Sequence, residues 1–205
     1  KEAIVDLVVG PDAYRDMLKL LDTVESGKNA VNTILSEEET YADITPIRYD
    51  TNGISAFISI MRGCQNFCSY CVVPYTRGKE RSRDPKTILN EAESLFEQGY
   101  REITLLGQNV NSYFWNEKNN TTHFWDLMSM IAAVNPLLRV RFATSHPKDL
   151  SDELLDVMSK FPNICKNIHL PVQSGSNHML KKMNRKYTRE WYLSRIEAIK
   201  SKMPD

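Results

Sequence analysis

The sequence predicts an α/β fold in which the strands of a parallel sheet alternate with helices. From about residue 54 onward, short apolar runs of strand length alternate with longer segments whose apolar residues recur at helical spacing. Each short run is also followed by a segment rich in polar or unusual residues. Such alternation favours a parallel sheet with right-handed crossovers. In α/β barrels, the loops at the carboxyl ends of the strands build the site.

The first 50 residues predict one strand and one helix, followed by a linker. Residues 4–9 are an apolar run of strand length, and Gly10-Pro11 is a turn with a proline suited to the first helical position. One helical face then carries four apolar or aromatic residues, Tyr14, Met17, Leu18 and Leu21. Residues 26–50 have no sustained period and many small and charged residues, so we expect a linker or an extended surface segment there.

The rest of the chain predicts four strands and the helices between and after them. The expected strands cover residues 54–61, 102–106, 139–143 and 164–170. The expected helices cover residues 85–98, 124–134, 151–160 and 188–202, with helical turns up to about residue 180. Asp84 is a suitable N-cap followed by a proline, Gly99 is a suitable stop signal, and Ser151 is a second cap.

Polar segments follow these strands and are expected to converge on one face of the sheet. They cover residues 64–83, 107–120, 144–148 and 171–177. The third strand, Arg139-Val-Arg-Phe-Ala143, alternates charged with apolar residues. One of its arginines is suited to point into a barrel lumen that holds a charged cofactor. The alternative is that Arg139 or Arg141 pairs with a carboxylate.

The composition is that of an ordinary globular protein. The chain has 205 residues, 41% of them apolar and 25% charged, enough for one large domain or one domain plus a piece of another. Lys and Arg total 26, as do Asp and Glu, so the net charge gives no information about nucleic-acid binding. No apolar run has the length of a membrane span, and no signal peptide opens the chain. Four cysteines, three of them clustered, fit a reducing cytosol, so we expect a cytoplasmic protein.

Three of the cysteines form the motif C-x3-C-x2-C at Cys64, Cys68 and Cys71. Iron–sulfur cubes normally take four thiolates, so three would leave one iron open to a substrate or cofactor. A structural zinc site takes four ligands, usually in paired short spacings, and the other cysteine, Cys165, is distant in the sequence. The spacing favours a cluster with an open iron, and zinc or ordinary thiols remain as alternatives.

Three segments resemble a known family. The first, Gly63-Cys-Gln-Asn-Phe-Cys-Ser-Tyr-Cys71, resembles the cluster loop of the radical S-adenosylmethionine (SAM) enzymes, including an aromatic residue before the last cysteine. The second runs from Val72 to Arg83, and the third from Leu105 to Tyr113. Both resemble the methylthiotransferases of this superfamily, in particular the branch that modifies an isopentenylated adenosine beside the tRNA anticodon.

The resemblance implies a partial (β/α) barrel of the radical SAM type. Such cores have six strands, whereas the pattern here predicts four, so we expect a barrel truncated to about four strands. The family also has an amino-terminal domain with three further cysteines and a carboxyl-terminal RNA-binding domain, and the sequence contains neither. We therefore expect a fragment, with residues 1–45 as the tail of the preceding α/β domain plus a linker. Residues 46–205 are then a radical SAM core that is incomplete at its carboxyl-terminal end.

The same resemblance implies a 4Fe-4S cluster on Cys64, Cys68 and Cys71, with the methionine end of SAM on the open iron. Reduction through the cluster by an electron donor cleaves SAM, and the resulting radical removes hydrogen from carbon 2 of the adenine. Sulfur comes from a second 4Fe-4S cluster on the missing amino-terminal domain, and a second SAM supplies the methyl group. The cofactors carry this chemistry, so no catalytic acid–base residues are expected.

Further contacts to SAM are expected in the loops. The resemblance implies that backbone groups after the second strand meet the methionyl amine, at Gly107, Gln108 and Asn109. This chain lacks the commoner Gly-Gly-Glu there, and a plain turn is the alternative. Tyr70 is expected to lie against the adenine of SAM, or else to be an ordinary packing aromatic. Other candidates offer donors for a carboxylate or ribose, namely Ser145, Gln173, Ser174 and, as a clamp for the SAM carboxylate, Arg185. We interpret His146 and His169 as hydrogen-bonded structural residues.

A tRNA anticodon stem-loop is the expected partner, and it requires positive charge near the site. Two basic groups are candidates for phosphate contact, Arg77, Lys79, Arg81 and Arg83 in one and Lys181, Lys182, Arg185, Lys186 and Arg189 in the other. Candidates for stacking on an unpaired base are Tyr113, Phe114 and Trp115. Ordinary solvated faces are the alternative for the basic groups. The alternative functions are a related enzyme that acts on a ribosomal protein and a zinc-stabilised RNA-binding module without catalysis.

Overall fold

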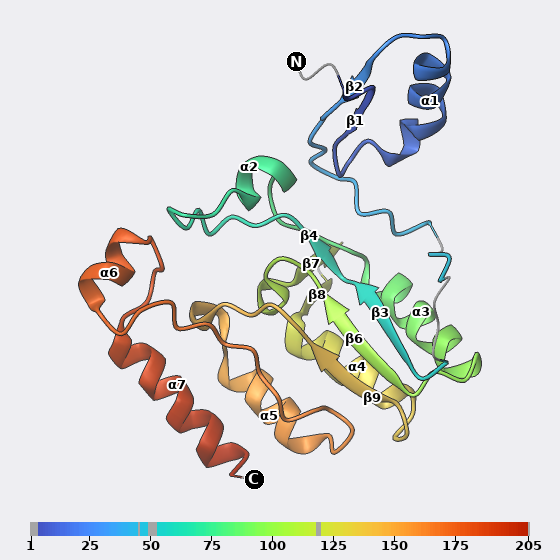
Figure 1. Cartoon of the computed structure of the whole chain (residues 1–205). Helices are drawn as coiled ribbons and strands as arrows, with labels where there is room; N and C mark the ends of the chain where they lie inside the picture. Colours follow the sequence, from blue (N-terminus) through green and yellow to red (C-terminus); the bar gives the residue numbers. More distant parts are fainter. Residues whose placement is uncertain (1–3, 45, 49–52, 118–119, 205) are drawn as a thin grey trace.

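A three-stranded parallel sheet forms the centre of the molecule (Figure 1). The computed structural model describes residues 4–44, 46–48, 53–117 and 120–204. The order of the strands is β3 (Ser55–Ser59), β6 (Glu102–Leu106) and β9 (Arg139–Phe142). Both pairings are parallel, as the alternation of strands and helices predicts.

Three helices cover one face of this sheet: α3 (Pro85–Glu97), α4 (Phe124–Val134) and α5 (Asp152–Lys160). Side chains along a strand alternate between its two faces, and here every second residue is buried. Ile58, Ile103 and Val140 point from the three strands into one hydrophobic core shared with these helices. The packed helices thus hold the strands from one side and leave their carboxyl ends free for loops.

The opposite face of the sheet is open in the described part of the chain. Phe57, in the middle of β3, is 64% exposed. On the same face the Arg141 guanidinium donates a hydrogen bond to the Glu102 carboxylate at 2.8 Å. Pairing with a carboxylate is therefore the interpretation of Arg141 that the structure supports. The strands do not close into a barrel.

The predicted strand over residues 164–170 is wrong. Only Ile164 bridges to the sheet, opposite Val140. Further along, backbone carbonyls are bonded by tyrosine side chains, since Tyr192 donates to Leu170 O at 3.0 Å and Tyr187 donates to Val172 O at 2.8 Å. After Ile164 the segment therefore runs on without extending the sheet, and tyrosine hydroxyls bind its carbonyls at Leu170 and just beyond, at Val172.

The predicted helices are confirmed, with their caps. The Asp84 carboxylate accepts from Lys86 N at 2.8 Å, and the hydroxyls of Ser151 and Thr188 accept from Leu154 N and Trp191 N, each at 3.2 Å. Two further helices complete the carboxyl-terminal part, α6 (Asn177–Lys182) and α7 (Arg189–Lys202). Three short 3-10 helices are also present, η1 (Tyr14–Asp16), η2 (Val110–Ser112) and η3 (Pro147–Asp149).

Several short elements were not predicted from the pattern. β4 (Met61–Arg62) and β5 (Arg81–Ser82) form a two-pair antiparallel ribbon, with α2 (Val73–Arg77) between them. β7 (Phe114–Glu117) and β8 (Asn120–His123) form an antiparallel hairpin in a segment expected to be a loop. Each of these elements is too short to show a period in the sequence.

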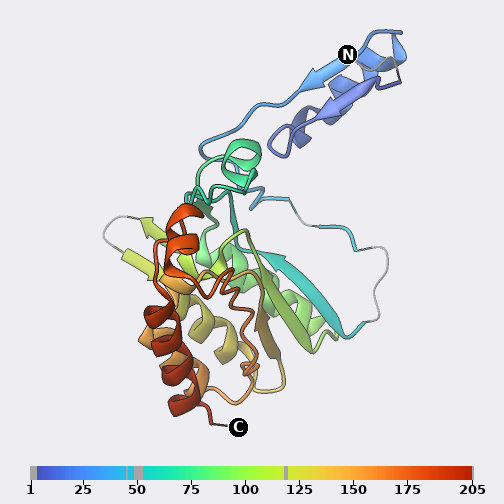
Figure 2. The ribbon, with the colours of Figure 1, turned by 60° about the vertical axis from the view of Figure 1, so that its left-hand side comes forward.

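The amino-terminal unit consists of β1 (Leu7–Val9), α1 (Met17–Glu25) and β2 (Ala30–Asn32). The two strands are parallel, so residues 30–32 are a strand within the predicted linker, which is a correction. The unit projects from the core beyond the segment that carries α2, as both views show (Figures 1 and 2). The described residues contain no helix long and apolar enough to cross a membrane.

Candidate functional site

The cysteine motif lies on a loop that leaves and returns through the ribbon of β4 and β5. Met61 pairs with Ser82 and Arg62 pairs with Arg81 at this stem. Directly after the stem, Gly63 has a φ of +76°, and a Cβ on it would lie 1.9 Å from Lys79 O. Glycine therefore allows the two ends of the loop to cross at a distance that no other residue permits.

The cysteine loop is held from two sides by residues distant in the sequence. On one side, Gly63 N donates to the Gln108 side-chain carbonyl at 2.6 Å. On the other, the Asn184 side-chain amide donates to Phe67 O at 2.8 Å, and Ser69 N donates to Met183 O at 3.1 Å. The segment between α6 and α7 thus fixes the part of the loop that carries the cysteines.

A cavity of about 170 Å³ lies beside the loop. It brings together most of the predicted site residues, Cys64, Cys68, Tyr70, Cys71, Gln108, Asn109, Ser145, Gln173 and Arg185. Four residues not predicted as contacts complete its lining, Asn66, Thr144, His146 and Pro171. All four polar segments expected to converge contribute to this lining. Three of them follow the strands β4, β6 and β9, whereas residues 171–177 follow a segment that is not a strand.

Gly107 and Ser174 are not brought to the cavity, and Gln108 has a second task. A Cβ on Gly107 would lie 2.4 Å from Met61 Cγ, so this glycine permits close packing between the ends of β4 and β6. The Ser174 hydroxyl accepts from Ser176 N at 3.1 Å, which is a local turn contact. Gln108 both lines the cavity and anchors the cysteine loop through Gly63.

All four cysteines are free thiols. Burial raises the pKa of the Cys64 thiol, and the Glu80 and Cys68 charges act in the same direction. The Arg185 guanidinium donates to Cys68 Sγ at 3.3 Å. No three histidine, cysteine, aspartate or glutamate side chains of the described ranges are grouped around one point as ligands of a single metal ion. The three motif thiols therefore line the cavity without enclosing one atom.

Three residues of the lining carry buried polar atoms without a hydrogen-bond partner: Asn109 Oδ1, Ser145 Oγ and His146 Nε2. The Asn109 amide nitrogen donates to Asp149 at 2.8 Å, which leaves Oδ1 as a free acceptor. His146 Nδ1 accepts from Lys148 N at 3.2 Å, so the neutral ring carries its proton on Nε2, a free donor. Buried polar groups are normally paired, and a ligand with both donors and acceptors would satisfy these three.

Arg185 joins the cysteine loop to the opposite wall of the cavity. Besides Cys68, its guanidinium donates to the Tyr70 hydroxyl at 3.3 Å and to Pro171 O at 3.4 Å. The Tyr187 hydroxyl accepts from Arg185 Nε at 3.2 Å and donates to Val172 O. Arg185 is 5% exposed, so a permanent positive charge is buried at the site.

Backbone strain is concentrated around this cavity. Thr144 and Gln173, which line it, have φ values of +71° and +65°. Phe67, Asn184 and Lys186, which adjoin lining residues, also have positive φ. A positive φ is rare for residues other than glycine and asparagine, and rarest for β-branched ones. Such strained positions cluster at functional sites, where the surrounding structure holds them in place.

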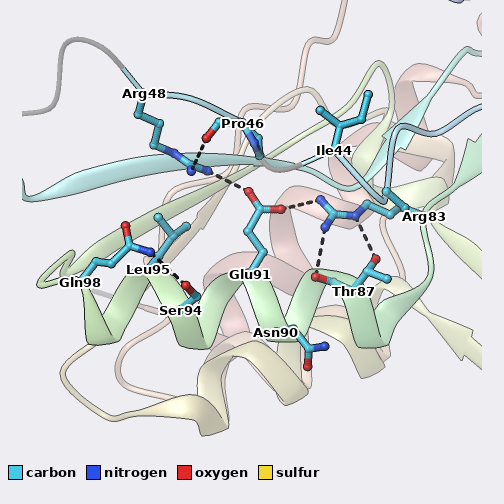
Figure 3. A pocket seen from close by; sticks show the side chains of 11 residues that line it. Ile44, Pro46, Arg48, Arg83, Thr87, Asn90, Glu91, Ser94, Leu95 and Gln98 are labelled. Atoms are coloured by element: carbon cyan, nitrogen blue, oxygen red, sulfur yellow. Dashed lines mark hydrogen bonds and ion pairs between the residues drawn. The ribbon is translucent and has the colours of Figure 1, made fainter. Parts of the chain in front are cut away.

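The first basic group is divided by the fold, and part of its predicted role is corrected. Arg77 and Lys79 are exposed, but Arg81 and Arg83 are 6% and 9% exposed and have protein partners. Glu91 lies between Arg48 and Arg83, at 2.8 and 2.5 Å, beside a pocket of about 310 Å³ (Figure 3). The charge of Arg83 is thus used inside the protein rather than offered to phosphate.

The residues of the second basic group differ in exposure, and so do the three aromatic residues predicted to stack on a base. Lys181, Lys182 and Lys186 are exposed, whereas Arg185 belongs to the cavity. Tyr113 is 2% exposed and donates through its hydroxyl to Arg83 O at 2.7 Å, so its predicted stacking on a base is wrong. Phe114 is 48% exposed and stays available for a base. Trp115 packs against the hydrophobic core, and His169 is exposed.

A protein-family model described as the radical SAM superfamily matches residues 58–205. Among curated relatives, the tRNA-2-methylthio-N(6)-dimethylallyladenosine synthase of Amoebophilus asiaticus is 59% identical over 211 residues, covering 98% of this chain and 43% of the relative. The proteins of the same name from Bacteroides fragilis and Chloroherpeton thalassium are 60% and 58% identical, with 44% and 45% of their lengths covered. The chain therefore spans less than half the length of these relatives.

Solved structures agree on the fold. The radical SAM methyltransferase TsrM from Kitasatospora setae, with tryptophan and a SAM analogue bound, matches with a TM-score of 0.66 at 16% identity. The match covers 95% of this chain and 43% of TsrM. The cobalamin-dependent SAM radical enzyme OxsB matches with a TM-score of 0.57 at 17% identity, covering 93% of this chain and 30% of OxsB.

Proposed function

Because the chain belongs to the radical SAM superfamily, we propose that it is part of an enzyme that adds a methylthio group to carbon 2 of an isopentenylated adenosine in tRNA. The observation that carries the proposal is the cavity. It combines the three thiols of the motif with the unpartnered polar atoms of Asn109, Ser145 and His146. The names of relatives at about 60% identity supply the substrate.

Cys64, Cys68 and Cys71 hold a 4Fe-4S cluster in this proposal. The donor set fits, since three free thiols face one cavity and a cube needs one thiolate for each iron that the protein ligates. With three thiolates, one iron stays open for SAM. When bound, the cluster and SAM supply the one-electron chemistry that generates a radical, and the chain supplies position and charge.

The chain binds the amino-acid end of SAM through the unpartnered polar groups. Asn109 Oδ1 accepts from the ammonium group, and the Nε2–H of His146 and the Ser145 hydroxyl donate to the carboxylate. Arg185 places its positive charge beside Cys68 and the same carboxylate. Tyr70 and Gln173, at the rim of the cavity, contact the nucleoside end. These pairings match donors to acceptors at the three unpartnered atoms.

The remaining parts of the reaction belong to the longer protein. Residues 1–45 are the tail of a preceding α/β domain with its linker, and residues 46–205 are the radical SAM core. Support comes from α1, none of whose residues is buried and whose Leu18 is 76% exposed, so the unit offers an apolar surface to further chain. In this proposal the preceding domain would hold a second 4Fe-4S cluster as the source of the sulfur, and an external donor would supply electrons.

Spectroscopy of the reconstituted chain tests the cluster and SAM. We expect iron and sulfide near four per chain after anaerobic reconstitution, and a change in the paramagnetic signal of the reduced cluster on addition of SAM. Cys68→Ala is expected to abolish both, because two thiolates do not hold the cube. Zinc with a complete ligand shell, or an iron signal indifferent to SAM, would refute the proposal.

Nucleoside mass spectrometry tests the substrate. The full-length protein is expected to convert isopentenyladenosine in tRNA to its 2-methylthio derivative, and to leave ribosomal proteins unchanged. Methylthiolation of a ribosomal protein with unmodified tRNA would assign the enzyme to the alternative branch.

A further inference from the structure

Asp12 belongs to the turn after β1, yet the stem of the cysteine loop binds its carboxylate. Arg81 donates to this carboxylate through both terminal nitrogens, from Nη1 to Oδ2 at 3.0 Å and from Nη2 to Oδ1 at 3.2 Å. Arg62 Nη1 lies 3.5 Å from Oδ1, and Ser36 N donates to Oδ2 at 3.1 Å. The side chains of Asp12 and Arg81 are 0% and 4% exposed. This is a buried ion pair between the amino-terminal unit and the core, in which both terminal nitrogens of Arg81 are bonded and its Nε is not.

The two arginines come from opposite strands of the stem. Arg62 ends β4, Arg81 begins β5, and the two residues face each other in the antiparallel pairing. The ribbon has only two pairs, and an isolated ribbon of this length is not stable in water. Because the Asp12 carboxylate binds both strands at once, it joins them at the point where the loop to Cys64 begins.

Contacts around the ion pair extend the junction. Arg62 also donates to Pro11 O at 3.2 Å, and its guanidinium lies 4.6 Å from the centre of the Tyr41 ring. Arg81 donates in addition to Ser36 O. A cavity of about 200 Å³ at this junction is lined by Leu35 and Ser36 from the amino-terminal side and by Cys64 from the loop. The amino-terminal segment is thus a wall of the space next to Cys64.

We propose that Asp12 is a positioning residue that fixes the stem of the cysteine loop, and Cys64 with it, to the amino-terminal unit. Removal of one partner of a buried ion pair leaves the other charge uncompensated. We therefore expect the stem to open when Asp12 is replaced by a neutral residue. The consequence for the reaction, a fixed geometry between the cluster and the sulfur-donating domain, rests on the proposed function. The mechanical role of Asp12 does not.

Hydrogen–deuterium exchange of the metal-free chain tests this role. Asp12→Asn keeps the shape of the side chain and removes its charge. We expect amides of residues 60–64 and 78–83 to exchange at least tenfold faster, with unchanged exchange in α4 and α5. The matched control is Glu37→Gln, which breaks the Lys79–Glu37 pair at the same junction, where both side chains are exposed at 65% and 75%. Unchanged exchange in Asp12→Asn, or an equal effect of Glu37→Gln, would overturn the proposal.

Alkylation of Cys64 by a maleimide, located by peptide mass spectrometry, gives a second readout that needs no cluster, SAM or tRNA. The rate is expected to rise in Asp12→Asn and to stay at the wild-type value in Glu37→Gln. If Asp12→Asn fails to fold, the pair Asp12→Leu and Arg81→Met decides the question, since it removes both charges of the Asp12–Arg81 pair and leaves Arg62, which is 16% exposed and still donates to Pro11 O. The double variant is expected to refold with a protected stem. Two results would contradict coupling through this pair. One is a double variant that stays unfolded, and the other is a change in stem exchange equal to the sum of the changes in the two single variants.

Discussion

At the scale of single residues, the cavity beside the cysteine loop is lined by buried polar atoms that have no hydrogen-bond partner. A buried donor or acceptor without a partner costs free energy of about 1–3 kcal/mol. Asn109, Ser145 and His146 each carry one such atom at the same cavity. These free-energy costs fall at one cavity, next to the strained backbone of Thr144. Such a concentration is typical of a site that binds a ligand.

Arg185 provides the first prediction. In Arg185→Met the buried charge next to Cys68 is lost. If the proposed function holds, a charge-assisted hydrogen bond to the SAM carboxylate is lost with it. Such bonds contribute about 1.5–3 kcal/mol, so SAM binding to the reconstituted chain is expected to weaken roughly 10- to 100-fold. Titration of the cluster signal with SAM measures this.

Arg189→Met is the matched control, because Arg189 is exposed at 57% and pairs with Glu190 on the surface. It is expected to bind SAM as the wild type does. Equal SAM affinities for the two variants would remove Arg185 from the site.

His146 provides a second prediction, on stability against pH. Burial, with the Arg185 charge nearby, lowers the pKa of His146 to about 3. The unfolded chain has a histidine pKa near 6.5, so it binds the extra proton first as the pH falls. The stability that comes from a neutral His146 is therefore complete above about pH 6.5 and is lost as the pH decreases toward 3.

Urea unfolding at pH 7.5, 6.0 and 5.0 measures this loss. The free energy of unfolding of the wild type is expected to decrease by up to about 1.4 kcal/mol per pH unit below 6.5, relative to that of His146→Asn. The asparagine side chain of this variant can still accept from Lys148 N. Substitution of the exposed His169 by Asn is the control for the loss of a histidine outside the cavity. Parallel slopes for wild type and His146→Asn would contradict the buried neutral state.

The sequence predicts the site residues unevenly, for a physical reason. Cys64, Cys68 and Cys71 are local in sequence, so their spacing alone indicates a shared ligand. Arg185 lies 117 residues from Cys68, and only the folded chain shows that the two are in contact. His146 is missed because its role depends on which ring nitrogen lacks a partner, which no motif encodes.

At the scale of elements, the crossing at Gly63 makes a third prediction. Gly63→Ala would place a Cβ 1.9 Å from Lys79 O at a φ of +76°, so the stem of the cysteine loop has to shift. We expect iron uptake on reconstitution to fall below about half of the wild-type level, while α4 and α5 keep their packing, because the strain is local to the stem. Iron analysis and circular dichroism measure both effects.

Gly99→Ala separates the clash from the strain. Gly99 has a φ of +100° but nothing within 4 Å of the added Cβ. This variant is expected to cost about 1–2 kcal/mol of stability and to take up iron normally. Normal iron uptake by Gly63→Ala would show that the loop tolerates the shift.

Predictability from sequence also varies among the elements. α3 and α5 are predicted with their caps, because the capping side chains are local to the helices that they begin. The ribbon of β4 and β5 is not predicted, since two pairs held by the Asp12 ion pair have no pattern of their own. The strand expected at residues 164–170 is reduced to one bridge at Ile164, and the Leu170 carbonyl at its end accepts from the Tyr192 hydroxyl, which lies 22 residues away in the sequence.

At the scale of the whole molecule, equal numbers of acidic and basic residues hide an uneven distribution of charge. Arg81 and Arg83 form buried ion pairs with Asp12 and Glu91, respectively. Arg77, on the same loop, is exposed next to the cavity-lining segment, and Lys181 and Lys182 are exposed at the end of α6. Within these two basic groups, the charge available to an RNA phosphate is therefore smaller than the sequence suggests.

Salt-dependent binding of an anticodon stem-loop tests this distribution. Each phosphate contact with a single strand releases counterions and contributes about 0.7 to the magnitude of the slope of log K against log salt. Arg77→Gln is expected to lower the slope by about that amount and to weaken binding of all stem-loops alike, since a phosphate contact reads no sequence. Arg101→Gln is the control, because Arg101 is exposed at the opposite, amino-terminal end of β6. If the two variants have the same slope, the RNA does not approach over the cysteine loop, and the substrate face must be sought elsewhere on the molecule.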